Sequence, residues 1–145
     1  MERHKKLLVL IIALIALLAV SCDMAGIHTG LKDTNLVGTW ESEKVSYINN
    51  DTLHDFGIKA TLTFAQNGDL VVVKAHYIKD RTSSVWNSDL SKNPEKTEYD
   101  VTILGNKLFI YDCKTTTKLN EAEYKIEENK LTILDPNDDN KEKVF

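Results

Sequence analysis

From residue 36 onward, apolar and polar side chains alternate along the chain, and dipeptides that favour tight turns separate the alternating segments. The three clearest are Asn67-Gly68, Gly105-Asn106 and Glu128-Asn129. Successive side chains of a strand point to opposite faces of a sheet, so alternation lets each hairpin bury one face. The pattern predicts an all-β domain of antiparallel hairpins over residues 36–145.

The first of these turns predicts a specific strand register. Asn67-Gly68 is a preferred two-residue connection of the type I′ turn, because both positions favour positive φ. This register places four apolar pairs on one face of the hairpin: Phe64–Val71, Leu62–Val73, Ala60–Ala75 and Ile58–Tyr77. Thr61 and Thr63 then lie on the opposite face, which is mostly polar, so the register also predicts which face is buried.

The other two turns predict two further hairpins with similar sequences, since Asn106-Lys107-Leu108 resembles Asn129-Lys130-Leu131. Their apolar pairs would be Ile103–Leu108, Val101–Ile110, Ile126–Leu131 and Tyr124–Ile133. Residues 118–129 also fit a helical period, but the match to the preceding hairpin favours a strand there.

About eight strands are expected in all: 37–48, 58–65, 70–78, 82–87, 97–104, 107–113, 122–127 and 130–135, with a terminal fragment near 143–145. Sequential antiparallel strands of this kind suit a small up-and-down barrel, which removes exposed sheet edges by closing on itself.

The N-terminus has the pattern of an export signal. Residues 1–6 are basic, and Leu7 to Val20 is an unbroken apolar run. At about 1.5 Å per residue this helix would span roughly 21 Å, short of the bilayer core of about 30 Å. We therefore predict a signal helix over residues 1–21, a flexible tether over residues 22–35 and a folded domain over residues 36–145.

The end of the apolar run, Ala19-Val20-Ser21-Cys22, resembles the lipobox of bacterial lipoproteins. The resemblance implies cleavage before Cys22 and lipidation of Cys22, which would tether the domain to a membrane. The protein would then lie in the bacterial cell envelope, facing the periplasm or the cell surface. A plain secretory signal and an uncleaved anchor are the alternatives.

The first expected strand begins with Gly38-Thr39-Trp40, which resembles the Gly-x-Trp signature of lipocalins. Later segments are similar to bacterial lipocalin-like domains: Leu62-Thr63-Phe64 with Asn67-Gly68, Tyr99 with Gly105-Asn106-Lys107-Leu108, and Tyr124 with Asn129-Lys130-Leu131. The resemblance implies that Trp40 plugs the closed end of a barrel whose open end binds a ligand. The Arg that stacks on this Trp in lipocalins has no counterpart, since Arg3 and Arg81 are the two Arg residues of the chain.

Charge and residue spacing argue against several other functions. The formal net charge is −4, and removal of the basic N-terminus makes the remainder more acidic, so nucleic acid is not an expected partner. His28, His54 and His76 lie far apart in the sequence, without metal-ligand spacing. No catalytic constellation is recognisable, and we predict a protein that is not an enzyme, with no metal and no cofactor.

The sequence thus predicts a membrane-tethered barrel that binds a small apolar or amphipathic molecule. The expected lining residues are Phe64, Val73, Tyr77, Trp86, Val101, Ile110 and Tyr124. The main alternative is an envelope protein with a filled barrel that contacts another protein through loops 49–57 and 79–96, and a purely structural lipoprotein is a third. Interior volume separates them, because a ligand site needs a cavity of about 300 Å³ or more.

Overall fold

The structure is a computed structural model that describes residues 30–31, 33–134 and 142–145. The described residues form ten strands in one antiparallel sheet. The strands are β1 (Gly38–Glu41), β2 (Ser46–Asn50), β3 (His54–Phe64), β4 (Asp69–Asp80), β5 (Asn87–Ser88), β6 (Glu95–Leu104), β7 (Lys107–Asp112), β8 (Lys118–Glu127), β9 (Lys130–Leu134) and β10 (Glu142–Val144).

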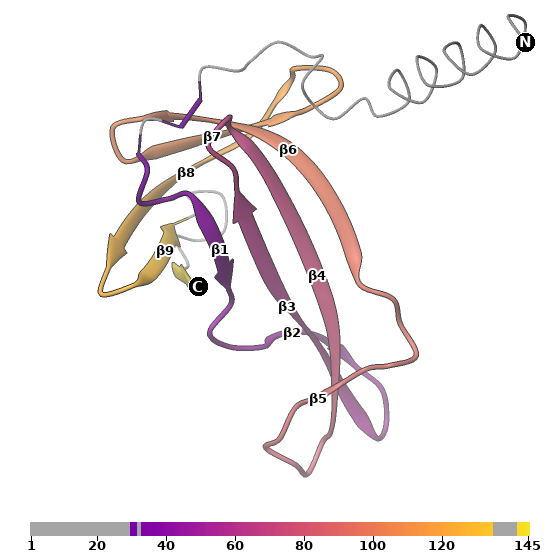
Figure 1. Cartoon of the computed structure of the whole chain (residues 1–145). Coiled ribbons are helices and arrows are strands. Elements are labelled where there is room, and N and C mark those ends of the chain that lie inside the picture. Colours follow the sequence, from indigo (N-terminus) through magenta and orange to yellow (C-terminus); the bar gives the residue numbers. More distant parts are fainter. Residues whose placement is uncertain (1–29, 32, 135–141) are drawn as a thin grey trace, which may run out of the picture.

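Eight of the described strands follow one another in the order β1-β3-β4-β6-β7-β8-β9-β10, while β2 pairs with β3 and β5 pairs with β4. This row of strands curls through 273° into a half-barrel (Figure 1). The predicted all-β, up-and-down architecture is therefore confirmed. The expected strand 37–48 is divided into β1 and β2, and the expected strand 82–87 is reduced to β5.

Two parts of the chain join the edges of the curled sheet. The backbone N–H of Glu43, just after β1, donates to the carbonyl of Val144 in β10 at 2.9 Å. The Nζ of Lys130 also lies 2.9 Å from Oε1 of Glu43. In the described chain these contacts take the place of a strand ladder between β1 and β10.

The second and third hairpins have the predicted register. Val101 pairs with Ile110 across β6 and β7, and Tyr124 pairs with Ile133 across β8 and β9. Glu128 and Asn129 both have positive φ, at 49° and 63°, which is the backbone of a type I′ turn. The strand assignment of residues 118–127 is confirmed as β8.

The register predicted for the first hairpin is wrong by one residue. Phe64 pairs with Leu70, and Leu62 pairs with Val72. The loop is longer than two residues, because the N–H of Ala65 donates to the carbonyl of Asp69 at 2.9 Å and Gly68 alone has a positive φ of 100°. A type I turn followed by a left-handed glycine forms such a three-residue loop. The one-residue slip exchanges the two faces of β4, so Val72 points inward instead of Val73.

The core lies on the concave side of the sheet. Its buried members come from the strands around the half-barrel and from the segment before β1: Leu31, Leu36, Leu62, Phe64, Leu70, Val101, Leu108, Tyr124 and Leu131. The segment reaches the β3–β4 loop, where the N–H of Leu31 donates to the carbonyl of Gln66 at 2.9 Å. Residues 33–37 were expected to belong partly to the tether, but they cover one end of the core.

The distal halves of β3 and β4 extend beyond the half-barrel (Figure 1). We call this projection, which comprises residues 46–58 and 76–90, the arm. It contains β2, β5 and the ends of β3 and β4, and most of its side chains are exposed or half-buried. Within the described residues, no helix has the length and hydrophobicity needed to cross a membrane. The expected signal helix, Cys22 and residues 23–29 lie outside the described residues.

Candidate functional site

The concave side of the sheet encloses a cavity of about 270 Å³, which we call the interior cavity. Its walls are mainly apolar side chains from six strands and from the C-terminus: Leu62, Phe64, Leu70, Val72, Tyr99, Leu108, Ile110, Leu119, Ala122, Ile133 and Phe145. Asn120 and Lys143 are the polar members of the lining. Leu119 is exposed, so the cavity meets solvent on the side of β8 where this residue lies.

The predicted lining residues fall into three groups. Phe64 and Ile110 line the interior cavity. Val101 and Tyr124 are buried in the adjoining core, although neither borders the cavity. Val73 lies on the outer face of β4, because its neighbour Val72 lines the cavity and strand side chains alternate. The register error explains the misplacement of Val73.

Tyr77 and Trp86 belong to the arm and not to the cavity. Tyr77 pairs with Gly57, and a Cβ atom on Gly57 would lie 3.1 Å from the Trp86 ring. The Nζ of Lys79 is 5.3 Å from the centre of that ring, within the range of a cation–π contact. Trp86 therefore covers the backbone of β3 in the arm, where a larger residue than glycine would displace it.

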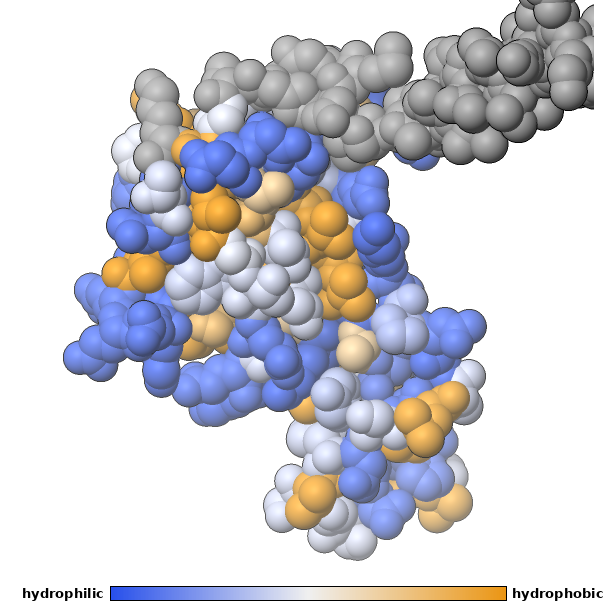
Figure 2. Space-filling view, in the orientation of Figure 1, coloured by the Kyte–Doolittle hydropathy of each residue, from blue (hydrophilic) through white to orange (hydrophobic). Residues whose placement is uncertain are grey.

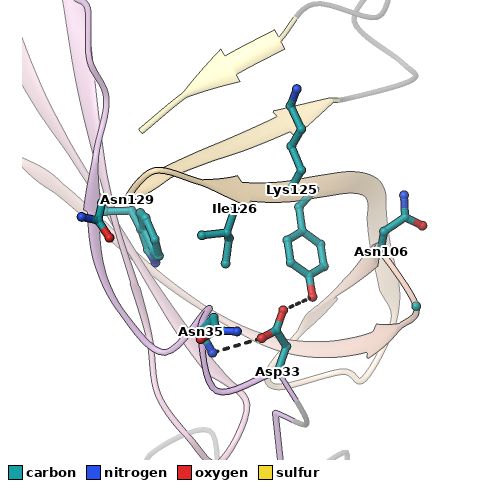
Figure 3. Close-up of a pocket in the computed structure, with 9 residues that line it drawn as sticks. Asp33, Asn35, Asn106, Lys125, Ile126 and Asn129 are labelled. Carbon is teal, nitrogen blue, oxygen red and sulfur yellow. Dashed lines mark hydrogen bonds between the residues drawn. The ribbon is translucent and has the colours of Figure 1, made fainter.

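A second cavity, of about 460 Å³, lies at the end of the half-barrel that residues 33–36 cover (Figure 3). We call it the end cavity. The β6–β7 turn contributes Asn106, the β8–β9 turn contributes Asn129, and the segment before β1 contributes Asp33 and Asn35. The remaining lining residues are Trp40, Gly105, Tyr124, Lys125 and Ile126. The two cavities have no lining residue in common.

Asp33 is held in place at the end cavity by two hydrogen bonds. The hydroxyl of Tyr124 donates to Oδ2 at 2.8 Å, and the backbone N–H of Asn35 donates to Oδ1 at 3.0 Å. Burial, followed by the bond to Asp33, raises the pKa of Tyr124 to about 12. The phenol is therefore protonated at neutral pH, and it fixes a carboxylate at the cavity wall.

Trp40 lies where the end cavity meets the core. Its Nε1 donates to the carbonyl of Leu36 at 2.9 Å, and its ring packs against the buried cluster. Leu36 is completely buried and Leu31 is 3% exposed, and both belong to the buried cluster that Trp40 packs against. The sequence identified Trp40 from its motif, but the end cavity was missed because Asp33 and Asn35 were assigned to a tether. The sequence signal that could have indicated the end cavity was the asparagine that recurs in the turns of the second and third hairpins, Asn106 and Asn129.

The arm presents large apolar side chains to solvent, and Figure 2 shows hydrophobic residues scattered among hydrophilic ones on this projection. The exposed members are Tyr47, Ile48, Leu53, Val85 and Leu90. Leu90 is 93% exposed and Leu53 is 68% exposed. These positions lie in or beside loops 49–57 and 79–96, which the sequence nominated for protein contacts.

The histidines of the arm contact carboxylates. His54 lies 3.4 Å from Asp51 and 3.5 Å from Asp80, while His76 lies 3.4 Å from Glu95. Among the described residues, no group of His, Cys, Asp and Glu has the arrangement of a metal site.

Comparisons of the chain with protein-family models, with curated proteins and with solved structures gave no match.

Proposed function

We propose that the half-barrel binds a small apolar or amphipathic molecule in its interior cavity. The observation that supports this function is the apolar lining of the interior cavity on the concave face. Its volume of about 270 Å³ lies slightly below the roughly 300 Å³ expected for a usual ligand site, which restricts the proposal to a small ligand. Desolvation of an apolar ligand in such a cavity favours binding by about 25 cal/mol for each Å² of surface removed from water. The opening strand with Gly38 and Trp40 supports a lipocalin-like arrangement, in which the ligand lies within the curled sheet.

The dimensions of the cavity limit the size of the ligand. At about 30 Å³ for each water-sized group, the cavity holds roughly nine such groups. This corresponds to a medium-length acyl chain and excludes a complete membrane lipid. A carboxylic acid with a short apolar chain is an amphipathic molecule of this size.

Isothermal titration calorimetry with octanoate tests this function. Octanoate should bind, and butanoate should bind more weakly because it buries less apolar surface. Ala122→Leu would fill part of the cavity and should lower the affinity for octanoate at least tenfold, since Ala122 lines the wall. Ala75→Leu is the matched control, because Ala75 lies on the outer face of β4. Equal binding by both variants, or none by the unmodified chain, would contradict an interior site.

We also propose that Cys22 carries the lipid that tethers this domain in a bacterial envelope. The support is the lipobox-like sequence before Cys22, after an apolar run too short for a usual membrane span. Metabolic labelling with radioactive palmitate should mark the chain. Labelling should disappear in Cys22→Ser, and persistent labelling of that variant would assign the lipid to another residue.

A second candidate function is contact with another envelope protein through the arm. The supporting observation is the exposure of Leu53, Val85 and Leu90 on one projection. A photo-cross-linking residue at position 90 should then form a discrete adduct in cells. The same residue at position 104, which is exposed outside the arm, should not form it. Equal cross-linking at both positions would indicate non-specific contact.

A further inference from the structure

The end cavity differs from the interior cavity in its chemistry. Its lining includes three asparagines, all exposed, the carboxylate of Asp33 and the phenol of Tyr124, with Trp40 and Ile126 as apolar members. We propose that the end cavity is a second binding site and that it takes a neutral sugar ring. This site does not depend on the proposed function, because it shares no wall with the interior cavity.

The amides are the first argument for a sugar. Asn35, Asn106 and Asn129 each offer a side-chain carbonyl that accepts and an amine that donates two hydrogen bonds. None of these side-chain groups has a hydrogen-bond partner among the described residues. A sugar hydroxyl both donates and accepts, so a ring with several hydroxyls can pair with all three amides.

The turns that carry two of these amides are fixed by the fold. Asn129 has a φ of 63°, which asparagine tolerates better than most residues, and Gly105 precedes Asn106 with the same φ. The carbonyl of Asn106 also accepts the backbone N–H of Tyr124 at 2.8 Å. The β6–β7 turn is therefore attached to β8, and the backbone positions from which these two amides extend are set before a ligand arrives. Such preorganisation lowers the entropy lost on binding.

The carboxylate argues for a neutral ligand over an anion. Asp33 is held at the wall by Tyr124 and by the backbone of Asn35, so it cannot turn away from a bound molecule. Lys125 is exposed and its Nζ lies 3.6 Å from Oε2 of Glu127, so this lysine does not balance the charge of Asp33. The negative charge of Asp33 would repel a phosphate or another carboxylate. Each carboxylate oxygen retains capacity to accept a further hydrogen bond from a hydroxyl.

The apolar wall provides the remaining element of a sugar site. Trp40 and Ile126 border the cavity, and the indole N–H of Trp40 is already used on the carbonyl of Leu36. Trp40 therefore contributes apolar surface, which suits the C–H groups of a pyranose ring. At about 30 Å³ for each water-sized group, 460 Å³ accommodates roughly fifteen such groups, enough for one sugar ring with a substituent.

The test is a titration of the full-length chain, followed by the backbone amide signals in NMR spectra, with N-acetylglucosamine and glucose as probes. At about 10 mM probe, a site with a dissociation constant of about 1 mM is about nine-tenths filled. The amide signals of Asn106, Lys125 and Asn129 should shift, while those of residues that line the interior cavity should not. Glucose 6-phosphate should bind more weakly than glucose because of Asp33.

Asn129→Gly is the decisive variant, since glycine accepts the positive φ of the turn while the side-chain amide is lost. It should weaken binding of the probes about tenfold. Asn87→Ala removes an exposed amide from the arm and should leave the affinity unchanged. The proposal is overturned if neither neutral sugar shifts these signals, if Asn129→Gly binds as well as the unmodified chain, or if glucose 6-phosphate binds more tightly than glucose.

Discussion

The two halves of the β3–β4 hairpin have the same strand pairing but different surroundings. Near the loop, Phe64 and Leu70 form a cross-strand pair that is covered by the rest of the half-barrel, and Phe64 is 2% exposed. In the arm, Phe56 and Ile78 form an equivalent pair that is only half-buried. Backbone pairing continues along the whole hairpin, but the apolar core is confined to one half. A strand pair without a second layer is marginal by itself.

The arm is stabilised by local contacts of a different type. Nζ of Lys79 lies 2.6 Å from Oδ2 of Asp55, with both side chains 17% exposed. Lys79 also donates to the carbonyl of Ser83 and lies over the ring of Trp86. These contacts attach the β4–β5 loop to β3 and β4. We expect the arm to open locally at a lower free energy than the core, because it has few buried apolar contacts.

The largest expected difference between the halves comes from placing a charge at equivalent positions. Phe64→Asp should prevent folding, because it puts an unpaired carboxylate in the closed core. Phe56→Asp, eight positions earlier on the same face of β3, should cost about 1 kcal/mol and leave a cooperative transition. Urea denaturation followed by Trp fluorescence measures both. Similar losses of unfolding free energy in the two variants would show that the arm and the half-barrel share a single core.

Thr63→Asp is the control for the same strand. Thr63 is exposed on the outer face, where its hydroxyl lies 3.2 Å from that of Thr39. The free energy of unfolding should change by about 0.5 kcal/mol or less. A collapse of stability in this variant would contradict the inward orientation of Phe64.

Gly57→Ala should produce the next largest effect, and the effect should be local. A Cβ at Gly57 would collide with Cγ1 of Val45 and lie 2.9 Å from the carbonyl oxygen of Ser46. Overpacking of this type costs about 1–3 kcal/mol. Hydrogen exchange should accelerate in β2 and in the arm part of β3, while β7 remains protected. Val45→Ala in the same chain should restore part of the protection. An equal loss of protection in β7 would show that the two halves of the hairpin open together.

Tyr124→Phe probes the hydrogen bond between the core and the end cavity, and should cost about 1–2 kcal/mol. The folded-state pKa of Tyr124 is raised from 10.0 to about 12, so its contribution is complete below pH 10. The contribution then declines as the pH rises through about 12. The difference in unfolding free energy between the unmodified chain and the variant should therefore decrease over that interval. A difference that is constant with pH would contradict the raised pKa.

These contrasts also show which features could be predicted from the sequence. The registers of the second and third hairpins were predicted because Glu128-Asn129 and Gly105-Asn106 form the short turns that the residue types favour. The register predicted from Asn67-Gly68 was wrong because the same dipeptide also completes a three-residue loop with a left-handed glycine. The choice between these loops depends on whether Leu70 and Val72 or Val71 and Val73 meet the core. Both sets are apolar, so alternation alone does not decide.

The candidate sites were less predictable than the fold. Phe64 and Ile110 were assigned to the cavity because the predicted hairpins place each of them on the apolar face of its strand, which is local information. The end cavity depends on three segments that are distant in sequence, and Asp33 acquires its role by a hydrogen bond to a residue on β8. Trp86 was placed inside a barrel because it is large and apolar, but it covers the arm. Only the tertiary structure shows which layer a residue of this type joins.

Of the substitutions in the arm and in the half-barrel, Leu90→Ser should have the smallest effect on stability. Leu90 is 93% exposed in the arm, and its side chain loses little contact with water on folding. The free energy of unfolding obtained from urea denaturation should change by about 0.5 kcal/mol or less, with the slope unchanged. The matched variant is Leu108→Ser in the core, which should cost several times more because Leu108 is 1% exposed. If Leu90→Ser were instead destabilising, the side chain of Leu90 would be contacting its own domain in solution and would not be available to a partner.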